Sequence, residues 1–458
     1  MLFEKLRDNA SSDFLPMHMP GHKRNTQLLG KELPYELDIT EISGFDDLHE
    51  MRGVLRTLAE MATSLYGADS AFPMVNGSTG GILAAVRAAA CRGSGGSIIM
   101  SRFSHKSVYN AAELCSLAPV YLLPECCGAC ISAADVENAI KTTGDALCVV
   151  LTSPTYEGAV CDVAAIAEIT HAHGVPLIID AAHGAHFGFS EFFPQNATRL
   201  GADVEIVSLH KTLPALTQSA LLLARRGGLV PPKELERQLR VFETSSPSYM
   251  LLASIDRCLR LLCDTGEELF RVYEENLLYF YEKIRVLKRL EVAKMTGYDI
   301  GKIIINTKKS NITGKNLQSL LLEEHKIELE MAMPDYALAM TSICDTRDSF
   351  ERLAAALLSI DTQLKPGERQ SIEPYMLPKR ELAPFDARGK NGWPVMLSRA
   401  LGKVALEYVW AYPPGVPLLV PGEIVDEALL RHINGLQDAE LSLRSDYGRL
   451  PEIMCAAE

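Results

Sequence analysis

Four apolar segments of the sequence each lead into a polar residue that could take part in chemistry. Lys211 follows VEIVSLH, and Asp180 ends VPLIID. Ser78 and Thr79 lie in VNGSTGG, directly before a predicted helix, and His105 lies in SRFSHKS, between a predicted strand and a helix. Each residue alone has an ordinary structural explanation, such as a helix cap, a turn or a surface position. Because ligands of open parallel sheets bind outside the carboxyl ends of the strands, the four together predict one binding site.

Pyridoxal phosphate is a cofactor that needs all of these residue types. It requires a lysine for a Schiff base, a carboxylate at its pyridinium nitrogen, an anion site for its phosphate and a flat group against its ring. Lys211, Asp180, the turn that contains Ser78 and Thr79, and His105 meet these needs in that order. The backbone N–H groups at the start of a helix favour a phosphate in particular. The sequence therefore predicts a pyridoxal phosphate site.

Two other patterns compete with this interpretation. DAAHGAH spaces Asp180, His183 and His186 three residues apart, as metal ligands of a hydrolase could be, but no supporting carboxylate–histidine pattern stands elsewhere. Cys127 and Cys130 form a single C-x-x-C, and without a second pair a loop turn explains them better than zinc or redox chemistry. We therefore predict no metal.

The elements that position these residues follow from the hydrophobic pattern. Continuous apolar runs alternate with helical patterns along the first half of the chain. The predicted strands are 97–101, 118–123, 146–154, 175–181, 204–209 and 220–224, and the predicted helices are 80–92, 105–117, 133–143 and 163–174. This alternation predicts an α/β fold with a mostly parallel sheet flanked by helices, followed by smaller α+β C-terminal domains.

The same pass along the chain predicts four parts. Residues 1–55 form an N-terminal arm of turns and loops, and residues 56–265 form a large cofactor-binding domain. A small α/β domain covers 266–362, and a C-terminal module covers 363–458. The stretch 364–375 is typical of a linker.

Composition limits the classes of function. The 458 residues are 47% hydrophobic and 22% charged, with a net charge of −13, which argues against nucleic-acid and anionic-membrane partners. We find no signal peptide and no apolar run of membrane-spanning length. Eleven cysteines without a spaced disulfide framework are typical of a reducing compartment, so we expect a cytoplasmic protein.

Nine motifs then stand in the order expected of the ornithine/lysine/arginine decarboxylase family. They are MHMPGHK, DITEISGFDDLH, VNGSTGG, SRFSHKSV, LTSPTYEG, DAAHGAHF, SLHKTLPALTQ, TSSPSYMLLASID and YPPGVPLLVPGE. The resemblance covers residues 17–255 and 405–425, whereas 270–400 shows no matching motif. The chain resembles the short Gram-positive branch of the family, which has no N-terminal receiver-like domain.

The resemblance implies an aminotransferase-like fold (fold type I) and a homodimer or larger homo-oligomer with shared active sites. It also implies a role for each matching residue. Lys211 would bind the cofactor covalently, and Asp180 would contact the pyridinium nitrogen. The phosphate would be surrounded by Ser78, Thr79, Ser208 and His210, and the ring would lie between His105 and Ala182 on its opposite faces. His183 would lie near the substrate, and Thr244 and Ser245 would reach a neighbouring subunit's site. Asp46, Asp47 and Glu423 are candidate partners for the distal cation of a substrate, which would be costly to bury unpaired.

The implied activity is decarboxylation of arginine, lysine or ornithine to a polyamine and carbon dioxide, with arginine and lysine favoured over ornithine. Alternatives are an aminotransferase or lyase on the same fold, a degenerate relative that only binds the cofactor, and the metal hydrolase. The family often has glutamate where this chain has Ala181, and the final module is abbreviated. We expect Ala181 to alter support for the loop rather than to inactivate the enzyme.

Overall fold

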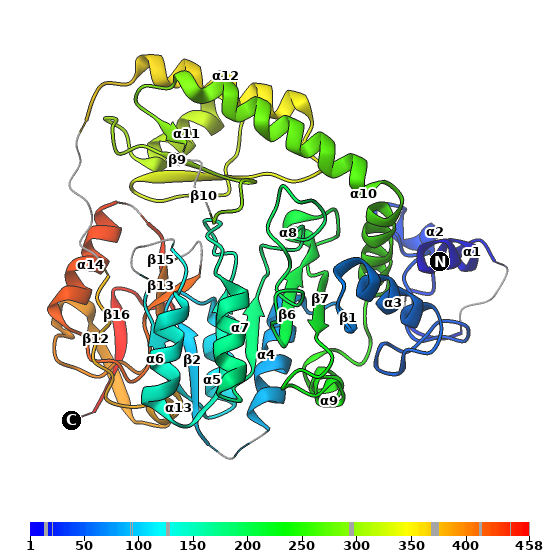
Figure 1. The fold of residues 1–458 in the computed structure, drawn as a ribbon, viewed down its shortest axis with the longest axis horizontal. Coiled ribbons are helices and arrows are strands. Elements are labelled where there is room, and N and C mark those ends of the chain that lie inside the picture. The colour runs from blue at the N-terminus through cyan, green and yellow to red at the C-terminus, as the bar shows by residue number, and fades with distance from the viewer. Residues whose placement is uncertain are drawn as a thin grey trace.

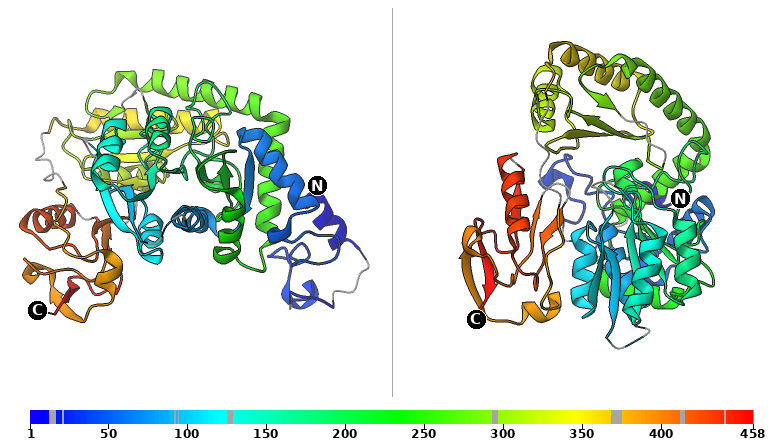
Figure 2. Two further views of the ribbon diagram at one scale, coloured as in Figure 1. Left: turned by 60° about the horizontal axis from the view of Figure 1, so that its bottom comes forward. Right: turned by 60° about the vertical axis from the view of Figure 1, so that its left-hand side comes forward.

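A computed structural model of the chain describes residues 1–12, 17–20, 22–91, 93, 95–124, 129–292, 297–367, 375–411, 415–439 and 441–457. A large domain with a seven-stranded sheet occupies the centre (Figure 1). A smaller α/β domain lies over one edge of this sheet, and the N-terminal arm and the C-terminal domain lie at opposite ends of the molecule (Figures 1 and 2).

The central sheet is mostly parallel, which confirms the predicted fold class. Its strands, in spatial order, are β1 (Ser70–Met74), β7 (Ala220–Ala224), β6 (Val204–Ser208), β5 (Leu177–Asp180), β4 (Ala146–Thr152), β2 (Ser97–Ser101) and β3 (Ala118–Leu122). Strands β3, β2, β4, β5 and β6 run parallel, while β7 runs antiparallel to β6 and β1. Strand β1 is not among the strands predicted from the sequence.

Helices cover both faces of this sheet. They are α3 (Val54–Tyr66), α4 (Gly77–Ala90), α5 (Lys106–Leu114), α6 (Ala133–Thr143), α7 (Val163–Ala172), α9 (Pro232–Phe242) and α10 (Tyr249–Lys283). The short helix α8 (Leu209–Thr212) instead follows β6 at the edge of the sheet. Successive strand residues enter different cores, since Ile178 packs in one apolar cluster and Ile179 in another. Two buried faces explain why the strands are continuously apolar rather than alternating.

The N-terminal arm is more helical than predicted. It contains α1 (Leu2–Ala10), α2 (Thr26–Leu29) and a short 3-10 helix, η1 (Leu48–Glu50). Leu2 and Leu6, one turn apart on α1, are both fully buried. The helix therefore forms because this apolar stripe packs against α10.

The small domain is built on an antiparallel sheet in the order β10 (Met331–Ala332), β11 (Tyr336–Met340), β9 (Lys302–Asn306) and β8 (Glu291–Val292). The 3-10 helix η2 (Ile284–Val286) and the helices α11 (Gly314–His325) and α12 (Arg347–Gln363) complete it. Helix α10 runs unbroken through residue 265, where the boundary between the large and the small domain is predicted. No break in the helix marks that boundary, which stays a prediction.

The C-terminal domain has an apolar core of its own. Its elements are α13 (Pro384–Arg388), β12 (Gly392–Met396), η3 (Leu397–Arg399), β13 (Val409–Ala411), β14 (Val416–Leu419), α14 (Glu427–Asp438), β15 (Leu443–Ser445) and β16 (Glu452–Ala456). Within the predicted linker, residues 368–374 lie outside the described part of the chain. None of the described helices combines the length and the apolar character needed to cross a membrane.

Candidate active site

The carboxyl edge of the central sheet gathers the polar residues that end its strands. Asp180 is the last residue of β5 and Ser208 the last of β6, and Lys211 lies in the short helix α8 that follows. His105 precedes α5, just after β2. Since β1 runs parallel to β6, helix α4 also begins at this edge (Figure 1).

Lys211 and His183 form the central contact of the site. Lys211 Nζ lies 3.0 Å from His183 Nε2. His183 follows Asp180 in a tight turn in which Gly184 N donates to Ala181 O at 2.8 Å. Burial lowers the pKa of Lys211, and the negative charge of Asp180 opposes this shift. Burial and the neighbouring lysines hold the pKa of His183 well below 6.5, so its imidazole is neutral at pH 7.

Asp180 is well placed to hold a positive group. Its side chain is buried and its Oδ1 accepts a hydrogen bond from Ala182 N at 3.2 Å. It lies near enough to His105 and Lys211 to interact electrostatically with both. His105 Nδ1 lies 2.8 Å from Ser107 Oγ, which fixes the orientation of its ring.

The start of α4 offers an anion site. Gly77 adopts φ +69°, a left-handed conformation that suits glycine, and its N–H donates to Gln218 O at 3.0 Å. Asn76 precedes the helix without a side-chain cap, so the N–H groups of Ser78 and Thr79 open the helix. At the end of β6, Ser208 Oγ is buried without a hydrogen-bond partner among the described residues. His210 Nδ1 is held 3.1 Å from Ser219 O.

Together these groups fit pyridoxal phosphate. The unpartnered hydroxyl of Ser208 and the uncapped helix start suit its phosphate, a buried carboxylate suits its ring nitrogen, and an amine of lowered pKa suits a covalent link. The departure at Ala181 is accommodated in the core, where its N–H donates to Ile206 O at 2.9 Å.

Three residues of the site were missed by the sequence analysis. Lys302 is the first residue of β9 in the small domain, and its Nζ lies 2.7 Å from His183 Nδ1. The Tyr156 ring lies 4.7 Å from the His183 ring, and its hydroxyl donates to Glu330. In the sequence, Lys302 could have been noticed as a charged residue at the start of the apolar run KIIIN. Tyr156 could have been noticed because it lies in the family motif LTSPTYEG.

The structure does not bring the three candidate carboxylates to this cluster. Asp46 Oδ2 accepts from the N–H groups of Gly53 and Leu55 at 2.6 and 2.9 Å. Asp47 caps η1, accepting from His49 N at 2.7 Å. Glu423 is fully buried, with its Oε2 3.2 Å from Arg102 Nη2.

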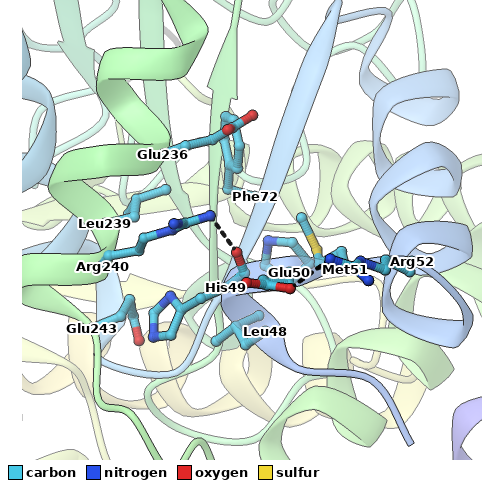
Figure 3. Close-up of a pocket in the computed structure, with 11 residues that line it drawn as sticks. Leu48, His49, Glu50, Met51, Arg52, Phe72, Glu236, Leu239, Arg240 and Glu243 are labelled. Carbon is cyan, nitrogen blue, oxygen red and sulfur yellow. Dashed lines mark hydrogen bonds and ion pairs between the residues drawn. The ribbon is translucent and has the colours of Figure 1, made fainter.

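Thr244 and Ser245 lie between α9 and α10, away from Lys211 in the chain and beside a separate pocket. That pocket, of about 400 Å³, is lined by Leu48, His49, Glu50, Met51, Arg52, Phe72, Pro73, Glu236, Leu239, Arg240 and Glu243 (Figure 3). His49 Nε2 lies 3.0 Å from Thr244 O. None of the strand-end residues lines this pocket.

The metal interpretation gains no geometric support. Both ring nitrogens of His183 face lysine amines, and His186 Nε2 is paired with Asp299 at 3.2 Å. In the described part of the chain, no three His, Cys, Asp or Glu side chains are arranged to hold a metal ion. Cys127 lies outside the described residues, and Cys130 is a free thiol.

Comparison with known proteins identifies the class. Residues 2–334 match the major domain of Orn/Lys/Arg decarboxylases, and residues 367–443 match the C-terminal domain of the same family. The arginine decarboxylase of Bacillus subtilis is 31% identical over 97% of this chain and 94% of its own length.

Solved structures agree on the fold. The Francisella novicida lysine decarboxylase superposes with a TM-score of 0.81 at 16% identity, covering 100% of this chain and 81% of its own. An alanine–glyoxylate aminotransferase from Nostoc sp. matches with a TM-score of 0.55 at 16% identity, covering 69% of this chain and 89% of its own. The family models and the 31% identical relative thus define a decarboxylase, and the solved structures show that it has an aminotransferase-like fold. The chain belongs to the Orn/Lys/Arg decarboxylase family, as its motifs indicated, and is an amino-acid decarboxylase.

Proposed function

We propose that this enzyme uses pyridoxal phosphate to decarboxylate arginine. The observation that supports this choice of cofactor is the cluster of Lys211, Asp180 and His183 beside the uncapped start of α4. Arginine is favoured over lysine because the 31% identical relative is an arginine decarboxylase, whereas the lysine decarboxylase of similar fold is only 16% identical. The product would be a guanidino amine, which suits a role in polyamine metabolism.

When bound, pyridoxal phosphate supplies an electron sink for the bond between the substrate's Cα and its carboxylate. Asp180 would keep the ring nitrogen protonated, and His105 and Ala182 would contact the ring. Ser78, Thr79, Ser208 and His210 would bind the phosphate. Lys211 would hold the group covalently in the resting enzyme, and Lys211 or His183 would donate the proton that replaces the carboxylate at Cα.

The distal guanidinium of the substrate needs an acceptor. Glu330 is exposed beside the site and acts electrostatically on both Lys211 and Lys302. It therefore joins Asp46, Asp47 and Glu423 as a candidate, and it is the one carboxylate of the four that the described structure places near Lys211.

We also propose a homodimer in the cytoplasm. Met17, Met19, Leu28 and Leu33 expose apolar side chains on the N-terminal arm, a pattern typical of a surface that packs on a partner. Thr244 and Ser245 would then serve the site of the second subunit. The nine described cysteines are free thiols, which suits a reducing compartment.

The test is carbon dioxide release from arginine, lysine and ornithine by the purified protein supplied with pyridoxal phosphate. We expect release from arginine, and loss of that release in Lys211→Ala. Full turnover in Lys211→Ala would overturn the assignment of Lys211. Conversion of the bound cofactor to its amine form without carbon dioxide release would indicate transamination, and a bound chromophore with neither reaction would indicate a degenerate relative.

A further inference from the structure

Thr152 ends strand β4 beside Asp180, which ends β5. The two strands are parallel and pair Thr152 with Asp180, so both side chains leave the sheet on the same face. Two positions earlier on each strand, Val150 and Ile178 both pack in the apolar cluster that contains Ile82 of helix α4. Thr152 therefore faces the side of the sheet on which α4 packs.

The hydroxyl of Thr152 is unpaired within the described part of the chain. Thr152 Oγ1 is buried and makes no hydrogen bond to any described residue, as is also true of Ser208 Oγ at the end of β6. A buried hydroxyl without a partner is costly, so each such group in a folded protein needs an explanation. The phosphate site accounts for Ser208, whereas Thr152 lies two strands away, on the other side of β5.

Two polar neighbours of Thr152 in the chain have partners of their own. Ser153 Oγ accepts a hydrogen bond from Cys161 N at 3.0 Å, and Cys161 packs in the other apolar cluster. The hydroxyl of Tyr156 donates to Glu330 of the small domain. Thr152 thus offers an unused donor at the end of β4.

The order of the strands determines which edge of a bound ring would face Thr152. The proposed phosphate site lies at the end of β6 and the start of α4, on one side of β5, and β4 lies on the other side. In pyridoxal phosphate, the phosphate arm lies to one side of the ring nitrogen and the phenolic oxygen lies to the other. With the nitrogen at Asp180, the phenolic oxygen would therefore point toward β4. Because adjacent strands are about 4.8 Å apart, a side chain at the end of β4 is near enough to reach it.

We propose that Thr152 is a further cofactor-binding residue, whose hydroxyl donates a hydrogen bond to the phenolic oxygen of pyridoxal phosphate. This oxygen carries a negative charge when the phenol is ionised, so a buried site must supply it with a donor. The bond fixes the rotation of the ring about its contact with Asp180. The inference rests on the proposed function, because it requires the cofactor to be pyridoxal phosphate.

The test compares two compounds, with binding measured by equilibrium dialysis in the absence of substrate. Thr152→Val keeps the branched shape of the side chain but lacks the hydroxyl, and 3-deoxypyridoxal 5′-phosphate lacks the phenolic oxygen. We expect Thr152→Val to weaken the binding of pyridoxal phosphate about tenfold, as the loss of one hydrogen bond does, and to leave the binding of the deoxy compound unchanged. Thr152→Ser keeps the hydroxyl and should restore the binding of pyridoxal phosphate.

The matched control is Thr170→Val, because Thr170 is also buried and its Oγ1 donates to Ala167 O at 3.1 Å within α7. It should leave the binding of both compounds unchanged. Equal weakening of both compounds in Thr152→Val would overturn the inference, since a hydroxyl that only supports Asp180 or the fold does not sense the phenolic oxygen. Undiminished binding of pyridoxal phosphate in Thr152→Val would overturn it as well. Failure of the wild type to take up pyridoxal phosphate at Lys211 is a different result, which would overturn the proposed function and the inference with it.

Discussion

At the scale of single residues, the site depends on how far burial shifts ordinary side chains. Lys211 and His183 both have lowered pKa values because they are buried. The charges of Lys302 and Lys211 lower the pKa of His183 further, whereas the carboxylates of Asp180 and Glu330 oppose the shift of Lys211. The enclosure of the site is thus part of its chemistry, because burial keeps the His183 imidazole neutral at pH 7 and makes the Lys211 amine easier to deprotonate.

Asp180→Asn tests the carboxylate at the end of β5. Asparagine keeps the shape and can still accept from Ala182 N, but it cannot hold a proton on the ring nitrogen by charge. We expect cofactor uptake to persist while the rate of carbon dioxide release falls ~100-fold or more. Uptake followed by absorbance is the internal control, and wild-type turnover would contradict the role of Asp180.

The sequence could predict the residues that end strands but not those that another domain brings to them. Lys211, Asp180 and Ser208 each close an apolar run, so the rule for parallel sheets places them at one edge. Lys302 begins an antiparallel strand 91 positions after Lys211, and nothing local links the two. The roles given to the site residues stay predictions until variants are measured.

At the scale of elements, the missed strand has a clear physical reason. β1 reads SAFPM, and Pro73 within it cannot donate a hydrogen bond to the sheet. It is tolerated because β1 is an edge strand that pairs only with β7. β1 leads directly into α4, so it positions the anion site at the start of that helix.

Glu243 couples two helices near that site and makes a prediction about pH. It follows α9, and its Oε1 lies 3.4 Å from Asn76 N, just before α4. Burial raises its pKa from the ordinary 4.5 to about 7, and the backbone N–H groups of Val75 and Asn76 oppose the shift. The folded protein therefore keeps a proton that the unfolded chain has lost, so this group makes stability fall as pH rises between 4.5 and 7.

Glu243→Gln keeps the acceptor oxygen and removes the titration. We expect the variant to be more stable than the wild type at pH 8, by on the order of 1 kcal/mol, and similar to it at pH 5. Thermal or urea unfolding at the two pH values measures this difference. An equal effect at both pH values would show that titration of Glu243 is not the cause.

At the scale of the whole molecule, the site is closed by parts that lie far apart in the sequence. The small domain contributes Lys302 and Glu330, and the hydroxyl of Tyr156, which follows β4, donates to Glu330. The resemblance did not reach residues 270–400, so this closure could not be predicted from motifs. Because Lys302 of the small domain contacts His183 of the large domain, the packing of the two domains affects the environment of this histidine.

The C-terminal domain is attached by a buried ion pair. Arg102, after β2, has its Nη2 3.2 Å from Glu423 Oε2, and both side chains are fully buried. Arg102 Nη1 donates to Pro417 O at 2.6 Å, and Glu423 Oε2 accepts from Val420 N at 2.8 Å. Arg102 Nε and Glu423 Oε1 have no hydrogen-bond partner among the described residues. The bonds that the pair does make connect the two domains, so it serves as a specific joint between them rather than as an isolated charge in the core.

Glu423→Gln would leave the guanidinium of Arg102 buried without its counter-charge, so we expect a loss of about 3–5 kcal/mol in the free energy of unfolding. Glu427→Gln is the matched control, because Glu427 forms an exposed pair with Arg431 at 3.5 Å and its loss should change stability by about 0.5 kcal/mol or less. Kinetics of the folded Glu423→Gln protein separate the two roles considered for this residue. An unchanged KM identifies Glu423 as the joint between domains, whereas a raised KM with little loss of stability would return it to the substrate's distal cation.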